Sequence, residues 1–336
     1  MTLINNNWGM FRTLIHSDWS MYGEKRWSAI AHHTKSGWRV VEIQLFSEVS
    51  ELLFKKRDQS ILAGFDFPIG MPNFWYEEAG VCNFLSFVDK LSSGEFQNFF
   101  NVSNTVSEIS SARPFYPNIA GKKGEKKKHH LLSQLNLSDS SQLLRECEKG
   151  HGNRSDASPL FWTIGAKQVG KAALSGWKEV VFPLFEKNAI LWPFQSFQLT
   201  DKSKSLVLLE TYPAEYYDFF EVGLMRGRSK RRQTDRKIAG SRMLAWLEVR
   251  NVSISPNLET KMRDGFGVSE EGEDPFDAVV GLCGMLDVVL GNRQPSPKLL
   301  PLHLEREGWI FGHSQSDSFE PPLGCRRVQF TNRIRP

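Results

Sequence analysis

The sequence predicts an α/β fold, in which helices cover the faces of a mixed sheet. Three observations lead to this prediction. Short apolar runs that are typical of strands alternate with segments of helical periodicity. Two of these runs, 60–67 and 205–210, are apolar almost throughout, as is usual for strands buried on both faces. The 336 residues are 40% apolar and 12% aromatic, which is enough for a sizeable packed core.

The first three expected strands follow one another directly. Residues 12–18 form an apolar run that ends at Asp18. Residues 26–33 and 38–45 alternate partly between apolar and polar side chains, and Gly and Ser lie between them. Two such runs joined by a short turn-forming segment predict a β-hairpin.

A helix and a fourth strand are expected next. Residues 46–58 place Val49, Leu52 and Leu53 on one helical stripe. Residues 60–67, SILAGFDF, then form a buried strand. Because a helical crossover precedes this strand, we expect it to run parallel to the first strand.

The middle of the chain is less regular. Residues 73–202 contain Ser- and Asn-rich patches, a lysine run and some helical pieces. This pattern indicates a large insertion of helices and loops, one of them basic. The expected organisation is a core made of residues 10–72 and 203–312, the insertion between these two parts, and a loop-rich tail over 313–336.

Regular patterns return after the insertion. Residues 205–210 predict another buried strand, and the basic segment 226–237 precedes an expected helix over 238–249. The last strong element is a helix over 273–291. Asp274 followed by Pro is a good N-cap and first helical residue, and a Gly closes the segment.

Composition restricts the class of protein. The N-terminus lacks the pattern of a signal peptide, and the longest apolar run is interrupted by Asp287 and is too short to span a bilayer. The four cysteines form no CxxC pair, and the net charge of +4 is mild. We therefore expect a soluble cytoplasmic protein with reduced thiols, no membrane partner and an oligomeric state that the sequence leaves open.

Acidic residues stand where three apolar runs end, at Asp18, Asp66 and Glu210. The carboxyl ends of neighbouring parallel strands meet at one edge of an open sheet, so these acids are expected to lie close together. Carboxylates that are brought together without a counter-charge repel one another, and their pKa values rise. A bound Mg²⁺ or Mn²⁺ ion removes this cost, because such ions prefer oxygen ligands.

The final helix supplies further acids. Asp274 and Asp277 are three residues apart and share a helix face, and Gly281 and Gly284 would let that helix approach the sheet closely. Asp274 and Asp277 therefore join the expected metal ligands, which are Asp18, Asp66, Glu210, Asp274 and Asp277.

Several of these segments resemble a known family. The motifs GFDFPIGMP, LLETYPAEYY, GEDPFDAVVGL and EGWIFG resemble, in this order, motifs of the domain-of-unknown-function family numbered 429. SDWSMYGEKRWSAIAHH resembles the first two strands of that family. The family is assigned to the RNase H-like superfamily and is predicted to contain nucleases. The resemblance implies a mixed five-stranded sheet with catalytic residues at Asp18, Asp66, Glu210 and Asp277.

Basic residues suggest nucleic acid as the partner. The segment RGRSKRRQTDRK has seven Lys and Arg residues against one Asp, so it could neutralise phosphates, although a solvated loop is an equally good interpretation. A lysine pair on an expected helix near residue 170 is a weaker candidate. The proposed nucleic-acid-binding residues are Lys167, Lys230, Arg231, Arg232 and Arg236.

The expected function is therefore a metal-dependent nuclease that uses two-metal-type catalysis on DNA or RNA. One alternative is a nucleic-acid-binding or interaction module whose RNase H-like site is inactive. A less favoured alternative is a nucleotide-hydrolysing relative of the actin-like ATPases, because the sequence has no glycine-rich phosphate loop. Two individual acids have structural interpretations as well: Asp66 could accept backbone N–H groups of the following turn, and Glu210 could pair with an arginine.

Overall fold

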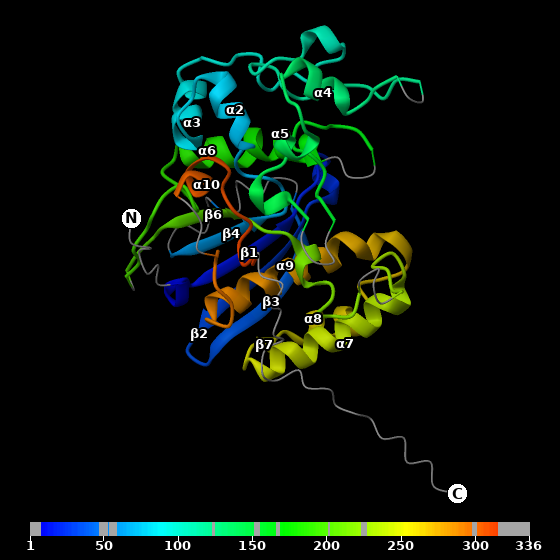
Figure 1. Ribbon diagram of the computed structural model, residues 1–336. Helices are drawn as coiled ribbons and strands as arrows, with labels where there is room; N and C mark the ends of the chain where they lie inside the picture. The colour runs from blue at the N-terminus through cyan, green and yellow to red at the C-terminus, as the bar shows by residue number, and fades with distance from the viewer. Residues whose placement is uncertain are drawn as a thin grey trace, which may run out of the picture.

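The computed structural model confirms the α/β class. Its strands form one seven-stranded mixed sheet in the order β5-β6-β4-β1-β2-β3-β7, and helices pack on both faces (Figure 1). The strands are β1 (Thr13–Asp18), β2 (Trp27–Thr34), β3 (Gly37–Leu45), β4 (Ile61–Phe65), β5 (Ile190–Leu191), β6 (Leu206–Glu210) and β7 (Ser253–Ile254). The structure describes residues 8–46, 53, 59–122, 125–150, 155–165, 169–200, 202–222, 227–297 and 301–314.

The strand pairings follow the prediction at the centre of the sheet. β1, β2 and β3 form an antiparallel unit, whereas β4 runs parallel to β1 and β6 runs parallel to β4. The expected five strands are thus all present, but a five-stranded sheet was too small a prediction. β5 and β7 add two residues each at the two edges, next to β6 and β3. Strands this short have no alternation that a sequence pattern could reveal.

Helices account for most of the remaining regular structure. Most of the helix expected over 46–58 lies outside the described residues, and α7 begins before residue 238. The helices are α2 (Asn73–Ala79), α3 (Phe84–Ser92), α4 (His129–Gln134), α5 (Val169–Gly176), α6 (Phe182–Phe185), α7 (Gln233–Val249), α8 (Pro256–Arg263), α9 (Glu273–Val289) and α10 (Pro301–Arg306).

The two faces of the sheet carry different layers. α9, with α7 and α8, covers one face, and α2, α3, α5 and α6 cover the other (Figure 1). Side chains of the central strands alternate between these layers, as the period of a strand requires. Leu14 of β1 joins the apolar core on the α9 side, and Ile15 joins the core on the opposite side.

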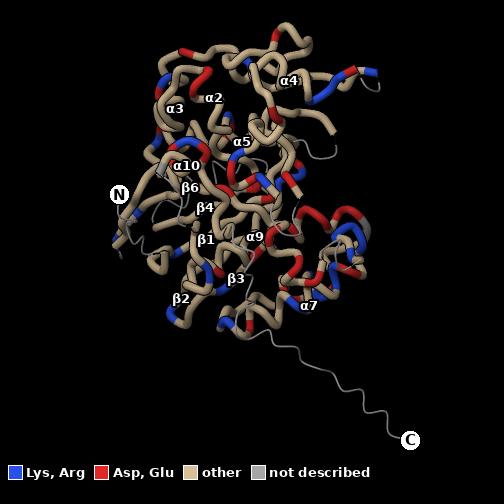
Figure 2. Tube along the Cα trace, viewed as in Figure 1, with Lys and Arg blue, Asp and Glu red and all other residues tan. Residues whose placement is uncertain are grey.

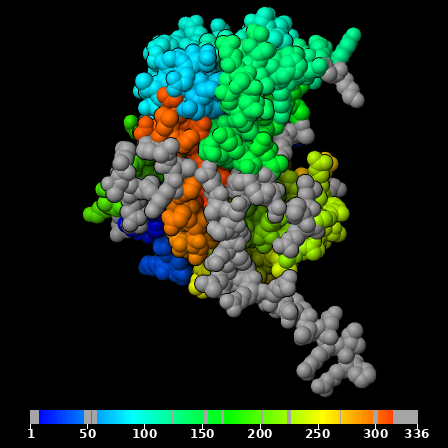
Figure 3. All heavy atoms as spheres, viewed as in Figure 1, coloured from blue at the N-terminus to red at the C-terminus, as the bar shows by residue number. Residues whose placement is uncertain are grey.

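The segment expected as an insertion shares its core with the sheet. Its aromatic rings pack on one another, for example Trp75 on Phe87 with ring centroids 5.1 Å apart and Phe99 on Trp177 at 5.9 Å. Phe65 of β4 belongs to the same buried cluster. In the space-filling view, the cyan and green atoms of this segment form the upper part of the molecule, above the orange atoms of α9 (Figure 3).

α9 is the most deeply buried helix of the described residues, with every residue from Pro275 to Val289 inside the protein. The glycines on its sheet-facing side have the expected effect. A Cβ atom on Gly281 would clash with the ring of His16, and one on Gly284 would lie 2.5 Å from the ring of Tyr216. The helix begins at residue 273 as predicted, but the predicted N-cap was wrong, because Gly272 is the N-cap and Asp274 lies inside the first turn.

No helix in the described part of the chain combines the length and apolarity needed to cross a membrane.

Candidate functional site

The register of β1 and β4 places Asp18 beside Asp66. Ser17 pairs with Phe65 in the parallel ladder, and each acid is the next residue of its chain. The backbone N–H of Trp19 donates to Asp66 Oδ1 at 2.7 Å. Two carboxyl groups on neighbouring strand ends resist being ionised together, because their negative charges repel.

α9 brings a third acid to this pair. Asp277 is 4% exposed, and both of its carboxylate oxygens accept hydrogen bonds. The hydroxyl of Tyr217 donates to Oδ1 at 2.6 Å, and the ammonium group of Lys230 donates to Oδ2. Asp274 is half-buried one helical turn earlier. Four of the five predicted acids therefore meet at one end of the sheet.

His16 fixes α9 against the sheet beside this cluster. Its Nδ1 lies 3.0 Å from the carbonyl oxygen of Ala278 and its Nε2 lies 2.8 Å from the hydroxyl of Thr211. Since a carbonyl oxygen only accepts, Nδ1 carries the proton, and Nε2 accepts from Thr211. Burial lowers the pKa of His16 to about 3, so the ring is neutral. His16 thereby joins β1, β6 and the helix that carries Asp277.

The acids perturb one another strongly. Burial, followed by repulsion from Asp66, Asp277 and Asp274, raises the pKa of Asp18 well above its usual range. Burial is also the main reason that the pKa of Asp66 rises to about 7. The positive charge of Lys230 acts in the opposite direction on both groups. Asp18 and Asp66 are both half-buried.

Glu210 does not join the acidic cluster, so its prediction as the third strand-end ligand needs correction. It pairs with Phe65, one residue before Asp66, and the backbone N–H of Thr211 continues the ladder by donating to Phe65 at 2.8 Å. Successive side chains of a strand point to opposite faces. Thr211 is therefore the residue level with Asp66 on the α9 side, whereas Glu210 projects towards the insertion.

Glu210 instead forms a buried ion pair, which was the structural alternative. Arg145 of the insertion donates to its two carboxylate oxygens at 2.6 and 2.7 Å, and the backbone N–H of Ile69 donates at 2.7 Å. Arg145 also pairs with Glu148 at 2.9 Å, and its own side chain is fully buried. This network connects the insertion to the end of β6.

The predicted nucleic-acid-binding residues divide into four groups, of which the buried Arg236 is the last. Arg231 and Arg232 have exposed side chains, at 73% and 58%, although Arg232 also pairs with Asp235 at 2.6 Å. Lys230 lies in the acidic cluster itself. Lys167 lies outside the described residues, so the structure says nothing about it.

Arg236 was wrongly predicted as a phosphate contact. It is fully buried in α7, and its guanidinium group donates to the carbonyl oxygens of Gly265 at 2.8 Å and Gly267 at 2.9 Å, and to that of Lys230. A guanidinium group held in this way positions backbone segments and does not face a ligand.

Charges around the start of α7 are mixed. Basic and acidic segments interleave in this part of the molecule and do not form separate patches (Figure 2). The ion pairs explain the pattern: Lys237 lies 3.1 Å from Asp264, and Arg228 lies 2.7 Å from Glu221. The basic segment of the sequence is therefore largely neutralised by neighbouring acids.

Sequence reasoning missed residues that complete the site. Tyr217 lies in the motif LLETYPAEYY, where only the acid was considered, and His16 alternates with Asp18 along β1, which is the signal that could have placed it on the same face. Lys25 follows β1 by a short loop, and its charge acts on Asp274.

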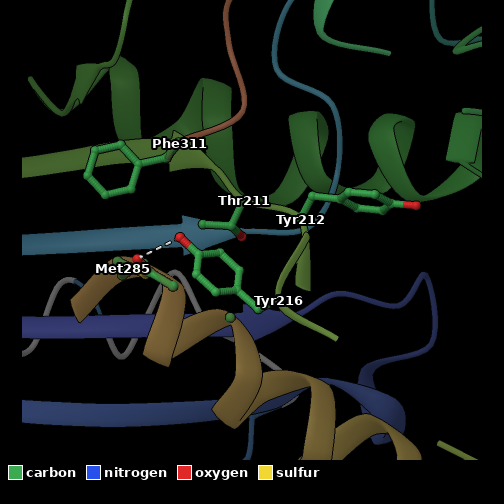
Figure 4. A pocket seen from close by; sticks show the side chains of 7 residues that line it. Thr211, Tyr212, Tyr216, Met285 and Phe311 are labelled. Atoms are coloured by element: carbon green, nitrogen blue, oxygen red, sulfur yellow. Dashed lines mark hydrogen bonds between the residues drawn. The ribbon is translucent and has the colours of Figure 1, made fainter. Parts of the chain in front are cut away.

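Two cavities near the acidic cluster differ in the space that they leave for a ligand. One lies between Thr211 and α9 and is lined by the ring of Tyr216, whose hydroxyl donates to the carbonyl oxygen of Gly284 at 3.2 Å (Figure 4). It has no room for a ligand. A second cavity, of about 50 Å³, lies at the end of the strands and is lined by both Asp66 and Glu210. Glu210 thus reaches the edge of the site from the opposite face of the sheet.

The donor set fits a hard divalent cation in its chemistry. Within the described residues, no three His, Cys, Asp or Glu side chains are arranged to hold a metal ion. Mg²⁺, however, usually takes one or two protein carboxylates and completes its shell with water and substrate phosphate. Asp18 and Asp66 offer such a pair; burial, and after it repulsion from neighbouring acids, raises the pKa of both, and a bound cation would oppose this effect.

Fold and site together define a class: a mixed α/β protein with a carboxylate cluster at the ends of two adjacent parallel strands and one helix. The chain matches no protein-family model, no curated protein and no solved structure. The sequence resemblance to a nuclease family is therefore a prediction that no comparison tests.

Proposed function

We propose that the protein is a metal-dependent nuclease with an RNase H-like fold. The observation that carries this proposal is the meeting of Asp18, Asp66 and Asp277, which come from β1, the end of β4 and α9. Buried carboxylates that repel one another destabilise a fold unless a cation is bound. Their placement at the carboxyl ends of parallel strands, where ligands of α/β proteins bind, supports a role in function.

The architecture agrees with this proposal. The five long strands form the mixed five-stranded sheet that the family resemblance implies, and β5 and β7 are short additions at its edges. The acids at the ends of β1 and β4 and in α9 are the positions that the resemblance names as catalytic. The exception is Glu210, so the proposed catalytic set is Asp18, Asp66 and Asp277, with Asp274 at its margin.

The proposed reaction is hydrolysis of a phosphodiester. The oxygen of a water molecule bonds to phosphorus, one P–O ester bond breaks, and the protons of the water end on the products, a phosphomonoester and an alcohol. Asp18 and Asp66 would hold a Mg²⁺ or Mn²⁺ ion, which would supply counter-charge and polarise a phosphate oxygen. Asp277 orients Lys230 towards the acid pair, and the exposed Arg231 is available to a neighbouring phosphate.

One observation favours the alternative of a binding module with an inactive site. Both oxygens of Asp277 are already occupied by Tyr217 and Lys230, so this acid is not free to bind a metal ion as it stands. In that case the basic side chains would bind nucleic acid and the acids would have only a structural role.

Cleavage assays distinguish the two functions. The wild type and Asp66→Asn are compared on single- and double-stranded DNA and RNA with Mn²⁺, and Asp264→Asn, an exposed acid of the α8 end, is the matched control. A nuclease predicts cleavage that is lost in Asp66→Asn and retained in the control. Equal cleavage by all three proteins, or none by any of them, would contradict the proposal.

A further inference from the structure

We propose that Lys230 is a fixed internal cation of this site, so that the site takes a single divalent ion, at Asp18 and Asp66, in place of the pair expected for two-metal catalysis. This inference rests on the proposed function, because it concerns the same site. It adds a role for a lysine that neither the sequence motifs nor the family resemblance assign.

Both carboxylate oxygens of Asp277 already accept hydrogen bonds from the protein, which opposes the binding of a second metal ion there. A carboxylate that bridged two ions would present both oxygens to them. Here Oδ1 accepts the hydroxyl of Tyr217 at 2.6 Å, and Oδ2 accepts the ammonium group of Lys230. The lysine therefore stands where a second ion would need to bind, and it brings a positive charge to the same carboxylate.

Lys230 is held in place by the protein around it. Its carbonyl oxygen accepts from the fully buried guanidinium group of Arg236. The preceding residue, Ser229, donates its backbone N–H to Asp235 at 2.9 Å. The side chain of Lys230 is 32% exposed, and its ammonium nitrogen also lies 3.9 Å from Glu273. This anchoring distinguishes Lys230 from a mobile surface lysine that could swing away from an incoming ion.

The acids that remain suit one ion. Asp18 and Asp66 are adjacent and partly open to solvent, and two carboxylates with water and a substrate phosphate satisfy the usual shell of Mg²⁺. A second dication at Asp277 would have to displace an anchored ammonium group. It would also stand close to that group's positive charge, which opposes binding.

Calorimetric titration with MnCl₂ measures the number of Mn²⁺ ions bound per chain and their affinity, without any substrate. We expect the wild type to bind one Mn²⁺ per chain. Lys230→Met should bind a second ion, or bind the first with a dissociation constant lower by about tenfold, because a positive charge next to the ligands is gone. Lys230→Arg keeps the charge and should bind as the wild type does. Lys237→Met, which breaks a lysine–aspartate pair outside the site, is the matched control and should not change Mn²⁺ binding.

The outcomes separate the inference from the proposed function. Two ions in the wild type, or Mn²⁺ binding that is the same in Lys230→Met and the wild type, would overturn the role of Lys230 and leave a metal-dependent nuclease standing. No Mn²⁺ binding by the wild type or by Lys230→Met, with both proteins folded by circular dichroism, would reject the nuclease proposal itself, and the inference with it. If Lys230→Met does not fold, the wild-type stoichiometry and Lys230→Arg still decide.

Discussion

Asp18 and Asp66 lie side by side on adjacent parallel strands, one residue beyond the paired Ser17 and Phe65, and repulsion from Asp66 adds to burial in raising the pKa of Asp18. The protein thus maintains a charged contact that weakens the fold in the absence of a cation. Acids of this kind are common at functional sites, where the arrangement needed for chemistry opposes stability.

The first prediction concerns the pH dependence of stability without metal. The pKa of Asp66 rises from 3.8 to about 7 on folding, so between these values the unfolded chain loses a proton that the folded protein keeps. Stability from this group therefore falls as pH rises through that window and stays low above it. We expect the melting temperature in EDTA to fall from pH 5 to pH 8, and to fall less in Asp66→Asn. Calorimetric scans of both proteins test this, and parallel pH profiles would contradict it.

The second prediction separates the two acids that sequence reasoning treated alike. Glu210→Gln leaves Arg145 as a buried charge with less compensation, which should lower the free energy of unfolding by about 3–5 kcal/mol. Asp66→Asn should instead leave stability at pH 8 unchanged or raise it, because it removes a repelled carboxylate. Urea denaturation at pH 8 in EDTA measures both changes.

The change in melting temperature on adding Mn²⁺ provides a control for Glu210→Gln and Asp66→Asn. An ion that binds only the folded protein raises its melting temperature. We expect this rise in the wild type and in Glu210→Gln, and its absence in Asp66→Asn. A rise that disappears in Glu210→Gln but persists in Asp66→Asn would place the metal on the opposite face of the sheet.

The error over Glu210 shows what a single sequence can determine. The end of an apolar run locates the edge of the sheet, and it placed Asp18 and Asp66 correctly at this edge. Which face an acid points to depends on the register between strands, and a shift of one residue reverses it. Because residues 206–210 are buried throughout, the run has no alternation from which the face of Glu210 could be read.

The prediction for Arg236 in the basic segment was wrong for a different reason. Arg236 was predicted as a phosphate contact in the basic segment before a helix, but α7 begins at Gln233 and the side chain is buried. Three backbone carbonyl groups make that burial possible, and two of them, from Gly265 and Gly267, lie 29 and 31 residues away in the sequence. Such compensation comes from tertiary structure, and no local pattern indicates it.

The α/β class, the five long strands and the close approach of α9 were all predictable, because they depend on apolar runs and small residues.

The third prediction tests the approach of α9 to the sheet. Gly281→Ala would place a methyl group against the buried ring of His16 and push the helix that carries Asp277 outwards. We expect a loss of about 1–3 kcal/mol in the free energy of unfolding, as for other overpacked cores, together with weaker Mn²⁺ binding. In the double variant Gly281→Ala, His16→Ala, the imidazole ring is gone and the methyl group has room. Adding Gly281→Ala to His16→Ala should therefore cost less stability than adding it to the wild type. Strictly additive losses, measured by urea denaturation, would show that the two residues are not coupled.

The fourth prediction divides the arginines near the site. The side chain of Arg231 is exposed, and its distance of 3.9 Å from Glu273 makes this a weak ion pair. Arg231→Ala should therefore leave the stability of the fold unchanged, and it should weaken nucleic-acid binding if this arginine contacts the ligand. If Arg231 contacts one phosphate, the slope of log affinity against log salt should become less steep by about 1. Arg236→Ala should instead destabilise the fold, because it leaves the carbonyl groups of Gly265, Gly267 and Lys230 without their donor. Fluorescence anisotropy of a labelled oligonucleotide with Ca²⁺ in place of Mn²⁺, at several salt concentrations, measures binding, and thermal melting measures stability. An Arg231→Ala protein that binds with the wild-type salt slope would remove this arginine from the nucleic-acid interface.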